Sequence, residues 1–331
     1  MLDIQHLTKT YGEKKAVDDL SLHIAPGEIY GFIGHNGAGK TTTLKSVVGI
    51  LQFDQGEITI DGRSIKADPL GCKREMAYIP DNPDLYDYMT GIKYLNFIAD
   101  VFGVDAQTRQ ARIRTYADAF ELTGDLAQPI AAYSHGMKQK LSIIAAWLHD
   151  PKVIIMDEPT LGIDPEGMRE LLNLIRELSV KDGRTVLISS HQLQQIQQVC
   201  DRVGIYVQGS LIACGTLAEL EAQIQKNGTY LLEVDVEPCD DQILGMLSAQ
   251  QGILKIEKEG RRFMITSKKD IRPQLTKFLG EHDYTVMHLH QRGGDLDEIY
   301  RRYFEKAGQN DESNESKTKK KYSWKHKSGS N

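Results

Sequence analysis

The sequence predicts an α/β fold with a mostly parallel, doubly wound sheet, followed by a small α+β unit. Three patterns support this prediction. A glycine-rich segment at 34–42 lies between an apolar strand at 29–33 and a helix at 42–48. Further strands and helices alternate over 76–189, which is typical of a parallel sheet. Over 228–305 the predicted order changes to βαββαβ, the order of a ferredoxin-like split motif.

The overall composition is that of a soluble globular protein. The 331 residues suffice for two domains, and 40% of them are hydrophobic and 26% charged. The net charge of −6 argues against a general nucleic-acid binder, so no nucleic-acid partner is expected. The four cysteines form no C-x-x-C pair, and no apolar run reaches the ~20 residues of a membrane span. With no secretion-signal pattern at the N-terminus, we expect a reduced, cytoplasmic protein.

A phosphate-binding loop is indicated by the pattern G-x-x-x-x-G-K-[ST]. The matching residues are Gly34, His35, Asn36, Gly37, Ala38, Gly39, Lys40, Thr41 and Thr42. The glycines let backbone N–H groups surround a phosphate, and the helix that follows adds its positive N-terminal dipole. Lys40 can reach the β- and γ-phosphates, and the Thr41 hydroxyl can hold Mg²⁺. An ordinary glycine-rich turn is the alternative, but the flanking strand and helix favour a nucleoside triphosphate.

Before and after this loop the pattern predicts short strands. Residues 2–7 and 16–24 alternate in polarity, with Tyr11 at the turn between them. On its position alone Tyr11 is interpreted as a half-buried strand residue. Two more strands are predicted at 56–62 and at 76–80, the second of which ends at a proline.

A helical insert is predicted from about 84 to 150, ending in a helix that Ser134 caps. A strand at 153–158, an amphipathic helix at 166–181 and a strand at 185–189 complete the α/β pattern.

Two acids, Asp157 and Glu158, end the apolar strand at 153–158. Two acids after a strand are by themselves more often solvated. In a protein with a phosphate loop, however, Asp157 can hold Mg²⁺ and Glu158 can take a proton from the attacking water.

These motifs together resemble the nucleotide-binding subunit of an ATP-binding cassette (ABC) transporter, in a match that covers residues 1 to about 218. The resemblance implies a P-loop NTPase of ABC type, with N-terminal antiparallel strands and a helical insert, over a domain at 1–220. It assigns Walker A to Gly34–Thr42, the signature to Tyr133–Met137 and Walker B to Val153–Glu158. The D-loop then lies at residues 161–164.

The resemblance also implies roles for single residues. Tyr11 falls at the position of the adenine-stacking aromatic, and His191 at the switch histidine that bonds the γ-phosphate. Asp81 falls at the Q-loop position, where the family has Gln or Glu that meets Mg²⁺ and senses the membrane partner. Ser134 and Gly136 of the signature contact the γ-phosphate bound by a second subunit.

Two positions depart from the family pattern. Asp81 is one methylene shorter than Glu, so its contact with the metal needs a water or a loop shift. The signature has His135 and Met137 where the family commonly has Gly and Gln. These substitutions affect the ribose and side-chain contacts, whereas the phosphate contacts of Ser134 and Gly136 are kept.

The implied function is that of an ATPase subunit that binds ATP and Mg²⁺ and powers a separately encoded integral membrane permease. Because the signature is too far from the chain's own phosphate loop, the site needs a second nucleotide-binding subunit, either a copy or a paralogue. A short C-terminal extension and the Tyr-Ser-His-Gly-Met signature favour a bacterial exporter-like type over an importer. A soluble ABC-type ATPase of ribosomes or DNA repair is the alternative. A GTPase is disfavoured because the N-K-x-D motif is missing.

The unit at 228–305 carries no catalytic constellation, and we expect it to be structural or dimer-stabilising rather than a small-molecule sensor. Its histidines, His282, His288 and His290, lack the Cys or carboxylate neighbours of a metal site. The Lys-rich segment 306–331 is predicted to be a disordered tail. Its Trp324, beside several lysines, suggests a contact with anionic lipid.

Overall fold

The computed structural model describes the chain except for residues 192–195, 197, 226–229, 241 and 293–331. The chain divides into two compact units, Met1–Cys214 and Gly215–Asn331. Within the described ranges no helix has both the length and the apolar character needed to span a bilayer. The tail predicted at 306–331, and the lipid contact predicted for it, lie outside the described residues.

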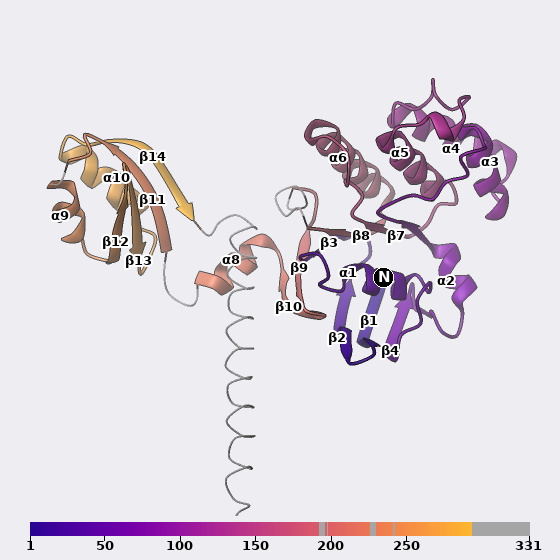
Figure 1. Ribbon diagram of the computed structural model, residues 1–331, viewed down its shortest axis with the longest axis horizontal. Helices are drawn as coiled ribbons and strands as arrows, with labels where there is room; N and C mark the ends of the chain where they lie inside the picture. The colour runs from indigo at the N-terminus through magenta and orange to yellow at the C-terminus, as the bar shows by residue number, and fades with distance from the viewer. Residues whose placement is uncertain (192–195, 197, 226–229, 241, 293–331) are drawn as a thin grey trace, which may run out of the picture. The chain divides into compact units, whose positions relative to one another are not determined.

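A six-stranded sheet forms the centre of the first unit, in the order β10-β9-β3-β8-β7-β6 (Figure 1). β3 (Ile29–Ile33) is parallel to β8 (Thr185–Ser190) on one side and to β9 (Arg202–Val207) on the other. β7 (Val153–Asp157) and β6 (Met76–Ile79) continue the sheet in parallel beyond β8. Because these strands are parallel, their carboxyl ends share one edge. The phosphate loop, Asp81 and Glu158 follow strands at that edge, and Asp157 is the last residue of β7 there.

A second, antiparallel sheet has the order β2-β1-β4-β5. Its strands are β1 (Leu2–Tyr11), β2 (Lys14–Ile24), β4 (Gln55–Ile60) and β5 (Arg63–Ser64). Figure 1 shows α1 (Lys40–Val47) between this sheet and the parallel one. Buried side chains of both sheets and of α1 form one hydrophobic cluster. The N-terminal hairpin is longer than predicted, since β1 extends to Tyr11, and α1 begins two residues earlier than predicted.

Helices cover the other face of the parallel sheet, where Figure 1 shows α5 and α6. The insert consists of α3 (Gly91–Val101), α4 (Ala106–Ala119), the 3₁₀ turn η1 (Ile130–Ala132) and α5 (His135–Trp147), and α6 follows at Pro165–Asp182. A short helix that the sequence pattern did not predict, α2, spans Pro69–Glu75. Asp68 caps it by accepting a 2.9 Å hydrogen bond from the Gly71 N–H.

The second unit has its own sheet and its own hydrophobic cluster. It follows β10 (Ser210–Gly215) and begins with α8 (Leu217–Gln225). Its remaining elements are β11 (Tyr230–Glu237), α9 (Gln242–Ser248), β12 (Ile253–Glu259), β13 (Arg262–Ser267), α10 (Arg272–Glu281) and β14 (Thr285–Arg292). The strands are antiparallel in the order β12-β13-β11-β14, the arrangement of a ferredoxin-like βαββαβ unit. In the part of the chain that the structure describes, no group of three or more His, Cys, Asp or Glu residues could hold a metal ion.

Candidate nucleotide-binding and hydrolysis site

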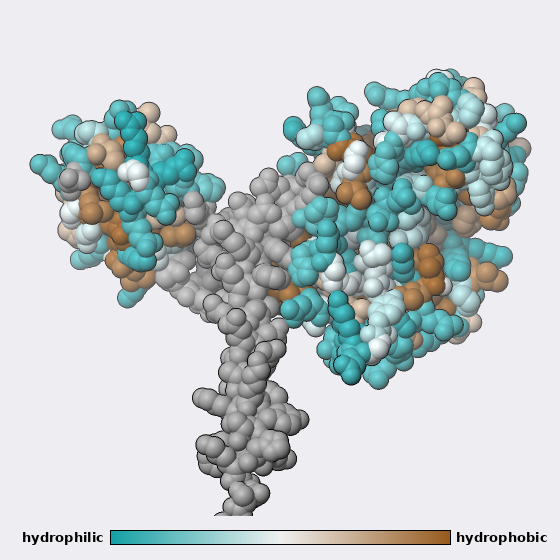
Figure 2. Space-filling view, in the orientation of Figure 1, coloured by the Kyte–Doolittle hydropathy of each residue, from teal (hydrophilic) through white to brown (hydrophobic). Residues whose placement is uncertain are grey.

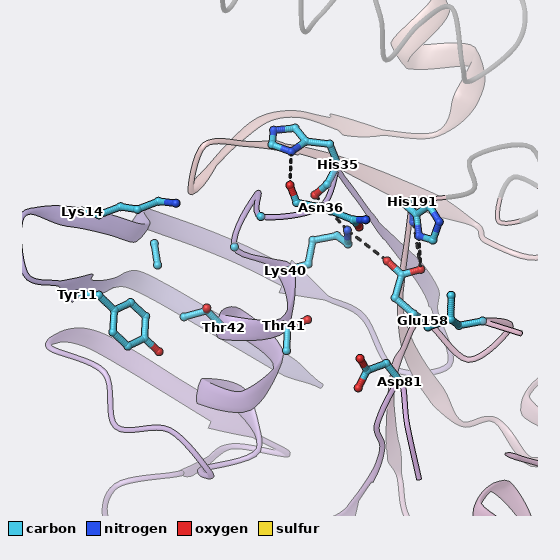
Figure 3. A pocket seen from close by; sticks show the side chains of 14 residues that line it. Tyr11, Lys14, His35, Asn36, Lys40, Thr41, Thr42, Asp81, Glu158 and His191 are labelled. Atoms are coloured by element: carbon cyan, nitrogen blue, oxygen red, sulfur yellow. Dashed lines mark hydrogen bonds and ion pairs between the residues drawn. The ribbon is translucent and has the colours of Figure 1, made fainter. Parts of the chain in front are cut away.

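A pocket of about 520 Å³ opens at the carboxyl edge of the parallel sheet (Figure 3). Five segments form it: the N-terminal hairpin, the phosphate loop, and the three loops that follow β6, β7 and β8. The lining residues are Tyr11, Lys14, Ala16, His35, Asn36, Gly37, Gly39, Lys40, Thr41, Thr42, Asp81, Glu158, Leu161 and His191. The structure therefore gathers most of the predicted site residues around one cavity.

The phosphate loop has a conformation that only glycine fits at Gly39. Its φ is +105°, and a Cβ there would lie 2.1 Å from the Ala16 carbonyl oxygen. Ala38 turns its side chain into the hydrophobic core, and its N–H donates to the His35 carbonyl at 3.2 Å. The Lys40 ammonium donates to the carbonyl oxygens of Gly34, at 2.7 Å, and His35, at 3.3 Å. Gly34 and Ala38 thus shape the loop without lining the pocket.

Asp157 ends β7 and is fully buried beside β8. The Ser189 hydroxyl donates to Asp157 Oδ1 at 2.5 Å. Burial raises the pKa of Asp157, while the hydrogen bond from Ser189 and the nearby Thr41 hydroxyl act in the opposite direction. Its second oxygen, Oδ2, is buried without a hydrogen-bond partner among the described residues. A free buried carboxylate oxygen next to a threonine hydroxyl is a donor set that suits a hard divalent cation such as Mg²⁺.

Glu158 lies between a cation and an imidazole. Its Oε1 is 3.3 Å from the Lys40 ammonium, and its Oε2 is 2.8 Å from His191 Nδ1. The His191 backbone N–H also donates to Oε2, at 3.3 Å. The Glu158 backbone has a φ of +48°, and its N–H donates to both the carbonyl and the hydroxyl of Ser189. These contacts fix the carboxylate at the end of the pocket where Figure 3 shows the Lys40 side chain.

Tyr11 and Asp81 lie on different sides of the pocket in Figure 3. Tyr11 is 51% exposed, and the Lys9 ammonium is 5.5 Å from the centre of its ring. A half-exposed ring on the pocket wall is available for stacking on a planar base. The Asp81 carboxylate is directed toward the side where Thr41 lies.

The signature residues lie away from the pocket. Ser134 caps α5 by accepting a 3.3 Å hydrogen bond from the Met137 N–H, and neither Ser134 nor Gly136 lines the cavity. The His135 ring packs against the D-loop, since a Cβ on Gly162 would lie 3.1 Å from its Cδ2. The signature therefore meets the D-loop at Gly162, one residue beyond Leu161, which lines the chain's own pocket.

Three residues at the site were not identified from the sequence: Lys14, Ala16 and Ser189. Lys14 is the cross-strand partner of Tyr11, so the correct hairpin register would have located it. Ser189 pairs with Asp157 across β7 and β8. That pairing depends on a register between distant strands, which the sequence pattern does not specify.

Comparison with known proteins gives consistent matches. A family model described as ABC transporter matches residues 17–161. The uncharacterized ABC transporter ATP-binding protein YhcH of Bacillus subtilis is 35% identical, over 78% of this chain and 85% of the relative. The linearmycin resistance ATP-binding protein LnrL of the same organism is 33% identical, over 74% of this chain and 78% of the relative.

Among solved structures, the fold matches the ATP-binding cassette MJ0796 in a dimeric post-hydrolysis state bound to ADP and Pi. The TM-score is 0.60, with 22% identity, over 65% of this chain and 98% of that one. This similarity confirms the predicted α/β cassette fold. The identity and coverage of the B. subtilis relatives confirm the predicted family. The chain belongs to the ABC transporter family and is one of its ATP-binding, ATP-hydrolysing proteins.

Proposed function

We propose that this ATPase drives export through a separately encoded membrane permease, with Glu158 as the general base. The observation that carries the catalytic part is the position of the Glu158 carboxylate, held between Lys40 and His191 at the pocket. A carboxylate held in one orientation beside a phosphate-binding lysine is suited to accept a proton from an attacking water.

The pocket accommodates a nucleotide in one orientation. Tyr11 stacks on the adenine, and the backbone of the loop from Gly37 to Thr42 surrounds the phosphates. Lys40 contacts the β- and γ-phosphates at the Glu158 end. Because the phosphates attract Lys40, they weaken its ion pair with Glu158, and the Glu158 carboxylate becomes available to the water.

Mg²⁺ fits the donor set formed by Thr41, Asp157 and Asp81. The unpartnered Asp157 Oδ2 is the observation that supports this, because a buried anionic oxygen needs a cation or a donor. When bound, the ion neutralises part of the charge on the phosphates. His191 then acts from the other side of Glu158, where it orients the water and hydrogen-bonds the γ-phosphate.

The site becomes complete only with a second nucleotide-binding subunit. Ser134 and Gly136 lie at the N-terminus of α5 and outside the pocket of their own chain. An exposed helix N-terminus stabilises an anion, so in a head-to-tail dimer it acts on the partner's γ-phosphate. The dimeric state of the similar cassette MJ0796 supports the pairing of two subunits.

The observation that supports a permease partner is an apolar groove on the first unit. It has a volume of about 300 Å³ and lies between the end of α1, β6 and the insert helices α3 and α5, where Ile50, Tyr94, Ile98 and Phe102 are among its lining residues. Val101, next to it on α3, is 63% exposed. Figure 2 shows apolar surface in the region beside α2. The name of LnrL associates that relative with linearmycin resistance, which favours export over import.

The variant Glu158→Gln tests the catalytic assignment. We expect ATP hydrolysis to fall about 10²- to 10⁴-fold, because the amide cannot accept the proton. ATP should still bind and should hold two subunits together in size-exclusion chromatography. Glu170→Gln is the matched control, since Glu170 is an exposed residue of α6 outside the pocket. Normal hydrolysis by Glu158→Gln would exclude Glu158 as the base.

The variant Val101→Asp tests the permease surface. A charge beside the apolar groove should prevent an integral membrane protein from co-purifying with the chain, without a change in ATP binding. Val180→Asp is the control, because Val180 is 61% exposed on α6, away from the groove. Equal recovery of the membrane protein with both variants would contradict this docking surface.

A further inference from the structure

Lys14 is a pocket-lining cation with no role in the assignments above. Lys40 is held by two carbonyl oxygens and by Glu158. For the Lys14 ammonium, by contrast, the described residues provide no ion pair. An unpaired ammonium at the wall of an anion-binding pocket is available to a charged ligand.

The hairpin determines where Lys14 points. Lys14 begins β2 and pairs with Tyr11 across the turn at Gly12 and Glu13. Successive side chains of a strand point to opposite faces. Lys15 accordingly lies outside the pocket, where its ammonium forms a 2.7 Å ion pair with Asp18.

The neighbours of Lys14 indicate which part of the bound nucleotide lies nearest to its ammonium. Figure 3 shows Lys14 on the side of the pocket where Tyr11 lies, with its side chain extending toward the phosphate loop. Lys40, Glu158 and Asp81 lie at the other end. With adenine on Tyr11 and the β- and γ-phosphates at Lys40, the segment nearest to Lys14 is the ribose and the α-phosphate.

The proposed Mg²⁺ donors also lie at the end of the pocket where Lys40 lies. Of the three phosphates, the α-phosphate is therefore the one whose charge Lys40 and the Mg²⁺ ion neutralise least. A lysine ammonium is a mobile point charge suited to a single phosphate oxygen. We propose that Lys14 is a nucleotide-binding residue that contacts the α-phosphate, and that it therefore acts on ATP and ADP alike. This inference rests on the nucleotide orientation given under the proposed function.

Calorimetric titration of the full chain with ADP, and with ATP in EDTA buffer, tests the inference. For Lys14→Ala we expect the Kd of both nucleotides to rise about fivefold, the effect of one partly exposed charge contact. The rise should shrink as salt is added, because salt screens an exposed charge pair. Lys14→Arg should keep the affinity, and Lys15→Ala, the matched control, should bind as the unmodified chain does.

Two results would overturn the inference alone: equal ADP affinity of Lys14→Ala and Lys15→Ala, or a loss confined to ATP, which would place Lys14 at the γ-phosphate. A failure of the proposed nucleotide site looks different, because the unmodified chain would then bind neither ADP nor ATP.

Discussion

Asp157 illustrates how burial controls the chemistry of one side chain. Burial raises its folded-state pKa above the value of about 3.9 in an unfolded chain. The ionised carboxylate therefore lowers the free energy of unfolding at neutral pH. This loss of stability disappears as the pH falls below the unfolded pKa, because Asp157 is then protonated in both the folded and the unfolded chain. A cation at Oδ2 would restore this stability at neutral pH by pairing with the charge of the Asp157 carboxylate.

The variant Asp157→Asn should therefore have opposite effects on stability and activity. Without metal at pH 7.5 we expect a higher midpoint of thermal unfolding than in the unmodified chain, and this difference should vanish near pH 3. Mg²⁺-dependent ATP hydrolysis should be lost. Mg²⁺ should raise the midpoint of the unmodified chain only. An equal rise in both proteins would contradict the placement of the ion at Asp157.

At this scale the sequence predicted residues that belong to local patterns. The phosphate loop and the Asp157-Glu158 pair are each defined within a few positions of the chain. Lys14 and Ser189 are not, because their roles arise from strand pairings, Lys14 with Tyr11 and Ser189 with Asp157. The ion pair of Glu158 with Lys40 likewise joins two loops that only the folded sheet brings together.

The end of α5 connects the helical insert to the parallel sheet. His149 lies just beyond this helix, with its ring stacked on Phe102 at 3.8 Å and its Nε2 3.1 Å from the Met76 carbonyl oxygen. Burial lowers the pKa of His149, as do the positive charges of Arg184 and Arg112, whereas the Met76 hydrogen bond and Asp150 act to raise it. The neutral imidazole is therefore the form that the fold accommodates.

A pH dependence of stability follows from His149. Because the unfolded chain binds the proton more tightly, the free energy of unfolding should fall as the pH drops below about 6.5, the unfolded pKa. Urea unfolding followed between pH 7.5 and 5.5 measures this decrease. His149→Gln should cost about 1 kcal/mol at pH 7.5 through the lost packing and hydrogen bond, and it should show a smaller decrease with pH. An unchanged decrease would exclude His149 as its source.

Elements with strong local signals were predictable, and short ones were not. The helix that Ser134 caps is present as α5, because the cap and the apolar face lie in one continuous segment. α2 has only seven residues, and its start depends on Asp68 and on a proline at its first position. β1 extends to Tyr11 because β2 pairs with it there, a contact that the polarity pattern at 2–7 does not reveal.

At the scale of the whole molecule, each of the two units has a hydrophobic cluster of its own. One is formed by residues between Leu2 and Tyr206, the other by residues between Leu232 and Tyr284. The sequence pattern predicted a change of architecture near 220–228, and the contacts divide the chain after Cys214. The predicted change rests on the end of the βα alternation in that region. The prediction and the contacts both place the β9–β10 hairpin, up to Cys214, in the first unit, and they differ over residues 215–220.

Ending the chain at residue 225 should separate nucleotide binding from dimer stability. The fragment keeps every pocket residue and loses all of the second cluster, so its Kd for ADP should stay within about twofold of the full chain. If the second unit stabilises the dimer, the Glu158→Gln fragment will need a higher protein concentration than the full-length variant to form its ATP-bound dimer. Sedimentation at a series of concentrations measures this. Equal dimerisation would make the second unit unnecessary for pairing, and loss of ADP binding would show that the first unit needs the second to fold.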